Sequence, residues 1–135
     1  MTDNINHPAH YEAAGYLVQP IDVTEALPFC LGNAVKYLAR AGKKDGSPEL
    51  EDMKKARWYI ERQMQVWKDG HESYLTLDRE TSAALFILET KKHQDFMIFE
   101  IEEETGLYWC DMDYLEQAAA SLGKRIREME QRASE

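Results

Sequence analysis

One stretch of the chain, residues 29–67, decides the fold: FCLGNAVKYLARAGKKDGSPELEDMKKARWYIERQMQVW. Apolar side chains recur in it at helical spacing on both sides of a short polar loop. Gly42 stands where a left-handed C-cap residue is favoured, and Ser47 before a proline is a favoured helix start. The stretch therefore predicts two helices that form an antiparallel hairpin. The first covers residues 29–41, and the second starts at Pro48 and ends near residues 68–70.

Three more helices are expected outside this hairpin, which makes the protein mainly α. Asp78 is positioned to cap the second of them, and Asp113 with Glu116 has the spacing of a capping box at the start of the third. The expected helices cover residues 22–27, 81–92 and 113–132.

The C-terminal half is also predicted to hold a small β-hairpin. Apolar and polar side chains alternate over 95–104, Thr105 and Gly106 form a turn signal, and residues 107–110 suit a second strand. One more helix over 95–104 is the alternative interpretation of the same residues. The predicted fold class is a helical hairpin core with further helices and this small β-hairpin.

Charge is distributed unevenly along the chain. The formal net charge is −9, yet residues 36–68 hold nine Lys or Arg against five Asp or Glu. The acidic total argues against general nucleic-acid binding and against binding to an anionic membrane, because both need a broad basic surface. A basic segment inside an acidic protein is instead a candidate site for a small anion.

The length and composition of the chain limit the number of domains that it can form. Its 135 residues, 44 % of them hydrophobic, suit one compact domain or two small ones. We expect residues 1–70 to form a helical domain and residues 71–135 to form an α(+β) extension that packs on it. No apolar run approaches the roughly 20 residues of a membrane span, and no signal pattern is present. Cys30 and Cys110 fit no metal or redox spacing, so both are expected to be reduced, packed thiols of a cytoplasmic protein.

The hairpin alone is expected to leave apolar surface uncovered. Trp58, Met64 and Trp67 together exceed what one short hairpin can hide. The third and last helices can cover one side, and a second copy of the chain can cover the rest. The sequence therefore predicts a homo-oligomer.

The first helix of the hairpin carries a candidate anion-binding face. Asn33, Lys36, Tyr37 and Arg40 are spaced at i, i+3, i+4 and i+7, which places them on one side of the helix. Lys43 and Lys44 extend the positive charge beyond its end. Arg offers a fork of donors and Lys a mobile point charge, so this face suits a phosphate group. The alternative is an ordinary solvated polar face.

The second helix supplies a matching set. Asp52, Lys55, Tyr59 and Arg62 also share one helix face, and in an antiparallel hairpin this face flanks the first one. Asp52 would then orient Arg40 or Lys36, or hold a metal ion. The alternative is a set of surface ion pairs, each contributing less than about 1 kcal/mol.

The N-terminal sequence HPAHY at residues 7–11 carries two further candidates. His10 suits an acid–base role, and Tyr11 suits stacking on a nucleobase. No cluster of Cys or carboxylates completes a zinc site, so no metal ligands are assigned. The Gly-rich phosphate loops of the Walker and Rossmann types are absent from the sequence.

Four short motifs follow one another along the first half: HPAHY, IDVTEA, FCLGNAVKYLARAGKK and EDMKKARWYIERQ. Together they resemble the SaV-like family of phage proteins, a domain also found in the nucleotide kinase of a T-odd coliphage. The resemblance covers about residues 7–65 and leaves 71–135 unassigned. The family pattern carries over onto Pro8, His10, Tyr11, Asp22, Asn33, Lys36, Tyr37, Arg40, Gly42, Lys44, Asp52, Lys55 and Tyr59.

The resemblance implies a phage protein that binds a nucleotide and acts as a (deoxy)nucleoside monophosphate kinase. Such an enzyme would use a nucleoside triphosphate as donor, with Mg²⁺ on the phosphates. Its implied catalytic residues are Lys36, Arg40, Lys55 and His10, with Asp22 as a second candidate beside His10. Its implied nucleotide-binding residues are Tyr11, Asn33, Tyr37, Lys43, Lys44, Asp52 and Tyr59.

Two other functions remain open from the sequence. A non-catalytic protein that sequesters a nucleotide, for instance one used in host defence signalling, needs the same basic face but no acid–base group. A protein–protein inhibitor would instead use the acidic second half to mimic a polyanion.

Overall fold

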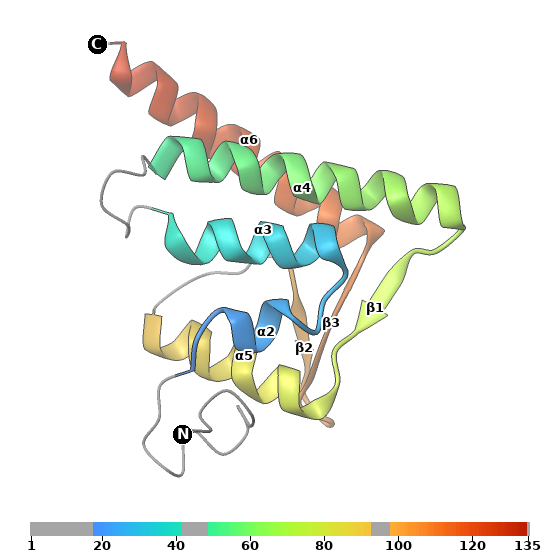
Figure 1. Ribbon diagram of the computed structural model, residues 1–135. Helices are drawn as coiled ribbons and strands as arrows, with labels where there is room; N and C mark the ends of the chain where they lie inside the picture. Colours follow the sequence, from blue (N-terminus) through green and yellow to red (C-terminus); the bar gives the residue numbers. More distant parts are fainter. Residues whose placement is uncertain (1–17, 42–48, 93–97, 135) are drawn as a thin grey trace.

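The computed structural model describes residues 18–41, 49–92 and 98–134 (Figure 1). Several predictions concern residues outside these ranges, namely those on His10, Tyr11, Gly42, Lys43, Lys44, Ser47 and Pro48.

The described residues form five helices and one small antiparallel sheet, so the predicted fold class is confirmed. The helices are α2 (Ile21–Thr24), α3 (Phe29–Arg40), α4 (Glu49–Gly70), α5 (Arg79–Lys92) and α6 (Met112–Ala133). The strands are β1 (Tyr74–Thr76), β2 (Glu100–Glu102) and β3 (Leu107–Asp111). None of the helices in the described part of the chain is long and apolar enough to cross a membrane.

The predicted hairpin is the centre of the fold. Helices α3 and α4 lie side by side, and α6 packs against α4 (Figure 1). Each helix buries one apolar stripe, as its spacing predicts. The buried apolar side chains of the two helices are Leu31, Ala34, Val35, Leu38, Ala39, Met53, Ala56, Ile60 and Trp67.

Helix α4 ends at Gly70, within the expected end at residues 68–70. His71 takes the left-handed conformation with φ 58°, and the Glu72 amide donates to the Trp67 carbonyl at 2.8 Å. The His71 amide donates to the Lys68 carbonyl at 3.3 Å. These two bonds are the Schellman pattern, which closes a helix one residue after its last helical position. Gly70 therefore lies inside the last turn, and a histidine occupies the position that usually favours glycine.

Helix α2 is shorter than predicted, because it ends at Thr24 and the 22–27 expectation was too long. Pro28 disfavours helical geometry at the residue before it, so the chain turns there instead. The turn brings α2 close to α3. A Cβ atom at Gly32 would lie 2.9 Å from the Thr24 carbonyl oxygen, closer than real Cβ atoms approach. Gly32 thus allows α2 to pack directly on α3.

The sheet has the order β1-β3-β2, with both outer strands antiparallel to β3. The predicted hairpin is confirmed as β2 and β3, so the helical alternative is wrong where Glu100–Glu102 form a strand. Gly106 at the turn has φ 74°. Strand β1 was not predicted, because alternation over only three residues is too short to recognise.

Of the two helix caps predicted outside the hairpin, that of α5 is confirmed, and that of α6 is wrong. Asp78 caps α5 as expected, because its Oδ1 accepts from the Thr81 amide at 2.7 Å. Helix α6 is capped by Asp111 and not by Asp113, since Asp111 Oδ1 accepts from the Tyr114 amide at 2.9 Å. Asp111 is the last residue of β3 and its backbone is extended, which is the geometry of an N-cap. Asp113 already lies in the first turn.

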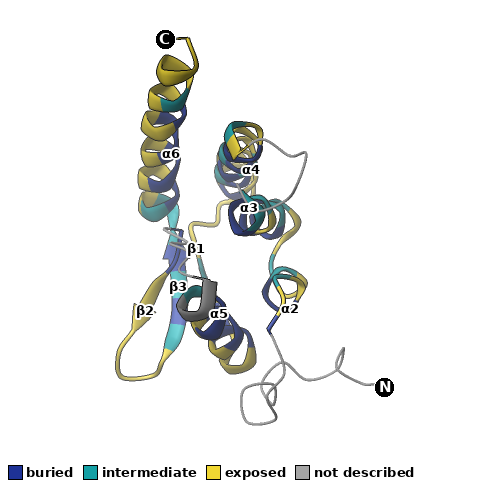
Figure 2. Cartoon of the chain, turned by 90° about the vertical axis from the view of Figure 1, so that its left-hand side faces the viewer, coloured by how far each residue is buried: buried dark blue, intermediate teal, exposed yellow. Residues whose placement is uncertain are grey.

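One hydrophobic cluster joins side chains of both halves of the chain. In Figure 2, α6 and the sheet lie on one side, α3 and α4 on the other, and the buried faces point inward. Helix α5 is tied to the sheet by Ser82, whose hydroxyl accepts from the Tyr108 amide at 3.0 Å. Helices α4 and α6 are also linked by an exposed ion pair, Lys54 Nζ to Glu130 Oε2 at 2.9 Å.

Both cysteines are free thiols, but only one is fully packed. Cys110 on β3 has no exposed surface, and this burial, with the negative charge of Asp111, raises its pKa to about 12. Cys30 is partly exposed. Because the thiolate is the reactive form, we expect a maleimide at neutral pH to label Cys30 and to spare Cys110 until the protein unfolds. Mass spectrometry of the labelled native protein checks this, and rapid labelling of Cys110 would contradict the packing of β3.

Candidate functional site

Aromatic side chains from both helices of the hairpin gather on one face. The rings of Tyr37 on α3 and Tyr59 on α4 are stacked, with centroids 6.0 Å apart and an interplanar angle of 11°. Phe29 and Trp58 meet Tyr59 edge-on, with centroid distances of 6.2 and 5.1 Å. We call Phe29, Tyr37, Trp58 and Tyr59 the aromatic cluster.

Three cations surround one ring of this cluster. Lys36 Nζ lies 4.6 Å from the Tyr37 ring centroid, Arg40 Cζ 5.0 Å and Lys55 Nζ 5.4 Å. We call Lys36, Arg40 and Lys55 the cationic cluster. Each cation–π contact at an exposed site contributes about 0.5–1 kcal/mol, which helps to hold three like charges near one another. Their mutual repulsion remains, so the binding of an anion among them is favourable.

A buried carboxylate orients the arginine of the cationic cluster. Asp52 on α4 is 0 % exposed, and its Oδ1 accepts from Arg40 Nε at 3.3 Å. Of the partners foreseen for Asp52, the structure therefore shows Arg40. No group of three or more His, Cys, Asp or Glu in ranges 18–41, 49–92 and 98–134 is placed to hold a metal ion.

A groove between α2 and α3 adjoins the aromatic cluster. Its volume is about 440 Å³, and we call it the α2–α3 groove. Asn33 lies in it, with Nδ2 donating to the Phe29 carbonyl at 3.1 Å. Phe29 and Lys36 belong both to the groove and to the clusters, so the two features are continuous. The groove is lined by Ile21, Thr24, Glu25, Leu27, Phe29, Gly32, Asn33 and Lys36.

The structure brings most of the predicted site residues together. Asn33, Lys36, Tyr37, Arg40, Asp52, Lys55 and Tyr59 all lie on or between the adjoining faces of α3 and α4. The predicted roles of His10, Tyr11, Lys43 and Lys44 concern residues that the structure does not describe.

Asp22 has a local structural role in the described fold. Its side chain is 7 % exposed, and Oδ2 accepts from the Gln19 amide at 2.8 Å. The Asp22 amide in turn donates to the Gln19 carbonyl at 2.9 Å. The two bonds fix the backbone just before α2.

Phe29, Thr24 and Glu25 were not predicted as site residues from the sequence, although they line the groove. Phe29 precedes Asn33 by four positions, so helical spacing contained a signal for it. Thr24 and Glu25 reach the site only because α2 docks on α3, and spacing within one helix carries no information about that contact.

Comparison with known proteins supports a relationship to phage proteins. A family described as a protein of unknown function (DUF3310) matches residues 5–61, a segment that contains the whole cationic cluster. The gene 1.7 protein of Enterobacteria phage T3 is 37 % identical over 65 residues, which are 43 % of this chain and 40 % of that protein. The matched part is thus about two fifths of that relative. No solved structure matches the chain.

Proposed function

We propose that the protein binds a nucleoside phosphate, with the phosphate on the cationic cluster. The observation that carries this proposal is the convergence of Lys36, Arg40 and Lys55 within 4.6–5.4 Å of the Tyr37 ring centroid. The cations supply charge-assisted donors for phosphate oxygens. The neighbouring aromatic rings supply a surface for a heterocyclic base, a pairing that is common in nucleotide sites.

The charge of the chain restricts the size of this anion. The net charge is −9, so the cationic cluster is a small positive region on an acidic protein. A long nucleic acid would meet repulsion beyond that region, whereas a mononucleotide would contact only the cluster.

The reaction that we propose is phosphoryl transfer to a (deoxy)nucleoside monophosphate. An oxygen of the acceptor phosphate attacks the terminal phosphorus of a nucleoside triphosphate, and the bond from that phosphorus to the departing nucleoside diphosphate breaks. Such a transfer depends mainly on positioning and on stabilisation of phosphate charge. Lys36, Arg40 and Lys55 suit that role, and Mg²⁺ carried by the donor phosphates would share it. The resemblance of the first half to a nucleotide kinase domain supports the same reaction.

One feature favours a second candidate, sequestration of the nucleotide without reaction. Asp52 is the carboxylate nearest to Lys55 in the sequence. It is fully buried and accepts a hydrogen bond from Arg40. Within the described cationic and aromatic clusters the side chains are cations and aromatic rings, which suit nucleotide binding and include no carboxylate or histidine. Unchanged nucleotide recovered after stoichiometric binding would support this candidate, and diphosphate formation would support the kinase.

Titration calorimetry with the four deoxynucleoside monophosphates tests the shared binding step. We expect Lys36→Ala and Lys55→Ala each to weaken binding by about tenfold, because each removes a charge-assisted contact worth about 1.4 kcal/mol. Incubation of the same proteins with a triphosphate donor and Mg²⁺ then reports any diphosphate product.

Lys68→Ala is the matched control for this experiment. Lys68 is an exposed lysine in the last turn of α4, thirteen residues after Lys55 on the same helix. The Lys68→Ala variant should bind the nucleotides with wild-type affinity. An equal loss in Lys68→Ala, or no binding of any of the four nucleotides by the wild-type protein, would contradict the proposed function.

The oligomeric state remains a prediction. Of the side chains on which it rests, Trp67 is 3 % exposed within the single chain, whereas Trp58 is 58 % exposed. Of these two side chains, Trp58 is therefore the one that a second copy of the chain would cover.

A further inference from the structure

The α2–α3 groove has walls of two chemical kinds. Ile21, Leu27 and Phe29 provide apolar surface, and the Phe29 side chain is 76 % exposed. Thr24, Glu25, Asn33 and Lys36 provide polar groups. Apolar walls with a few polar groups are the usual composition of a small-molecule site.

We propose that this groove holds the nucleoside part of the bound nucleotide while the cationic cluster holds its phosphate. The inference rests on the proposed function, because it assigns a second subsite to the same ligand. Lys36 belongs to the groove and also contacts the Tyr37 ring at 4.6 Å, so a ligand can occupy the two places at once.

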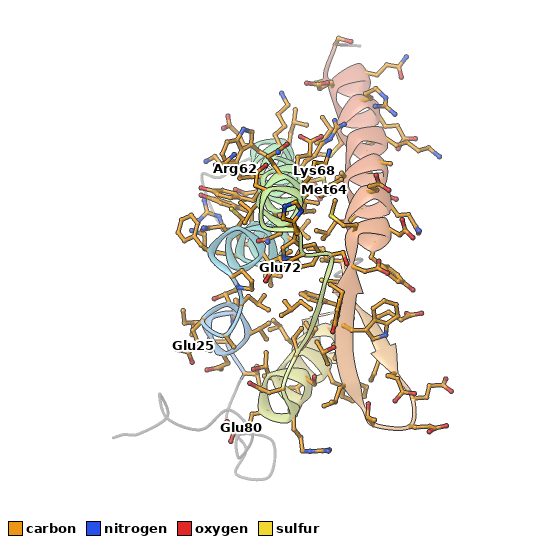
Figure 3. The ribbon with its side chains drawn as sticks, turned by 90° about the vertical axis from the view of Figure 1, so that its right-hand side faces the viewer. Glu25, Arg62, Met64, Lys68, Glu72 and Glu80 are labelled. Carbon is orange, nitrogen blue, oxygen red and sulfur yellow. The ribbon has the colours of Figure 1, made fainter. Side chains whose placement is uncertain are left out.

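The charges of the groove set the orientation of that ligand. Lys36 on α3 belongs to the cationic cluster, whereas Glu25 follows the last residue of α2, on the side of the molecule that faces away from α6 (Figure 3). The Glu25 carboxylate repels a phosphate but accepts hydrogen bonds from the N–H and O–H groups of a base and sugar. The phosphate therefore lies towards Lys36, and the nucleoside lies towards Glu25.

Phe29 is the residue that links base binding to the rest of the site. Its ring is exposed to the groove side and also meets Tyr59 edge-on at 6.2 Å. A base stacked on Phe29 would thus extend the aromatic cluster rather than lie apart from it. Stacking of one base on an aromatic side chain is typically worth about 1–3 kcal/mol, or roughly tenfold in affinity at the low end.

Binding of nucleotide and of inorganic pyrophosphate by the same variants tests the inference. Pyrophosphate has the phosphate groups without the nucleoside, so it reports the cationic cluster alone. We expect Phe29→Ala to weaken the binding of each deoxynucleoside monophosphate by about tenfold. The affinity of the same variant for pyrophosphate should stay within about twofold of the wild-type value. Ile21 lines the groove but is not part of the aromatic cluster. Ile21→Ala should weaken nucleotide binding by about threefold and likewise leave pyrophosphate binding nearly unchanged.

Phe86→Ala is the control, because Phe86 is an exposed phenylalanine on α5 outside the groove, and it should change neither affinity. Equal losses for nucleotide and pyrophosphate in Phe29→Ala would show that Phe29 acts through Tyr59, and would overturn the groove assignment. Unchanged nucleotide affinity in both groove variants would also overturn it, while wild-type nucleotide binding would still stand. Failure of the wild-type protein to bind any nucleotide would instead remove the proposed function itself.

Discussion

Replacing Asp52 with alanine is expected to lower the free energy of unfolding by about 2–4 kcal/mol, because Arg40 loses its buried, charged hydrogen-bond acceptor. The Asp52 carboxylate is 0 % exposed and accepts from Arg40 Nε at 3.3 Å, while the Arg40 side chain is 31 % exposed. The partial exposure of Arg40 reduces the cost, because water can solvate the guanidinium once the carboxylate is gone. Urea denaturation followed by circular dichroism measures the change.

Asp52→Ala should also weaken nucleotide binding. Without Asp52, Arg40 loses the contact that orients it beside the Tyr37 ring, so we expect nucleotide affinity to fall by at least as much as in Lys36→Ala. Glu51→Ala is the matched control, since Glu51 is the neighbouring acidic residue in the first turn of α4 and is exposed. Equal stability of the two variants would mean that the buried contact contributes nothing to the fold.

Replacing Leu122 with alanine is expected to destabilise the protein by about 2–5 kcal/mol, the usual cost of a cavity at a buried leucine. Leu122 lies on α6, has no exposed surface, and belongs to the cluster that joins both halves of the chain. Because α6 packs on α4, the loss should destabilise the hairpin and the sheet together. Unfolding monitored by tryptophan fluorescence and by circular dichroism should then give one shared midpoint.

Ser121→Ala, at the exposed neighbouring position on the same helix, should leave stability within about 0.5 kcal/mol of the wild-type value. Separate midpoints for the two probes in Leu122→Ala would contradict a common core. They would support the alternative that residues 1–70 and 71–135 unfold as independent units.

Local patterns in the sequence were sufficient to predict the helical hairpin and its charged face. The spacing of Asn33, Lys36, Tyr37 and Arg40 places them on one side of any α-helix, whatever the helix packs against. Asp52, Lys55 and Tyr59 follow the same rule, and a short loop leaves two successive helices few arrangements other than antiparallel. The residues of the predicted face therefore lie close together where the structure describes them.

Predictions were weaker where two local signals compete or where a segment is short. Asp111 and Asp113 are both acidic residues near the start of α6, and the choice of Asp111 as cap depends on β3 running directly into the helix. β1 has three residues, and it is a strand because β3 offers an open edge rather than because of its own pattern. The sequence of either segment alone does not contain the partner that decides its structure.

The sequence by itself determined the two helices, their buried stripes and the cationic face, because each depends on the 3.6-residue period of a single helix. Only the tertiary structure decided that three cations surround one ring, that Asp52 is buried against Arg40, and that α2 closes a groove beside them. These features arise where separate segments meet, and their geometry follows from packing contacts such as that of Gly32 with Thr24. Such contacts are set by the shapes of both partners, so neither segment specifies them alone.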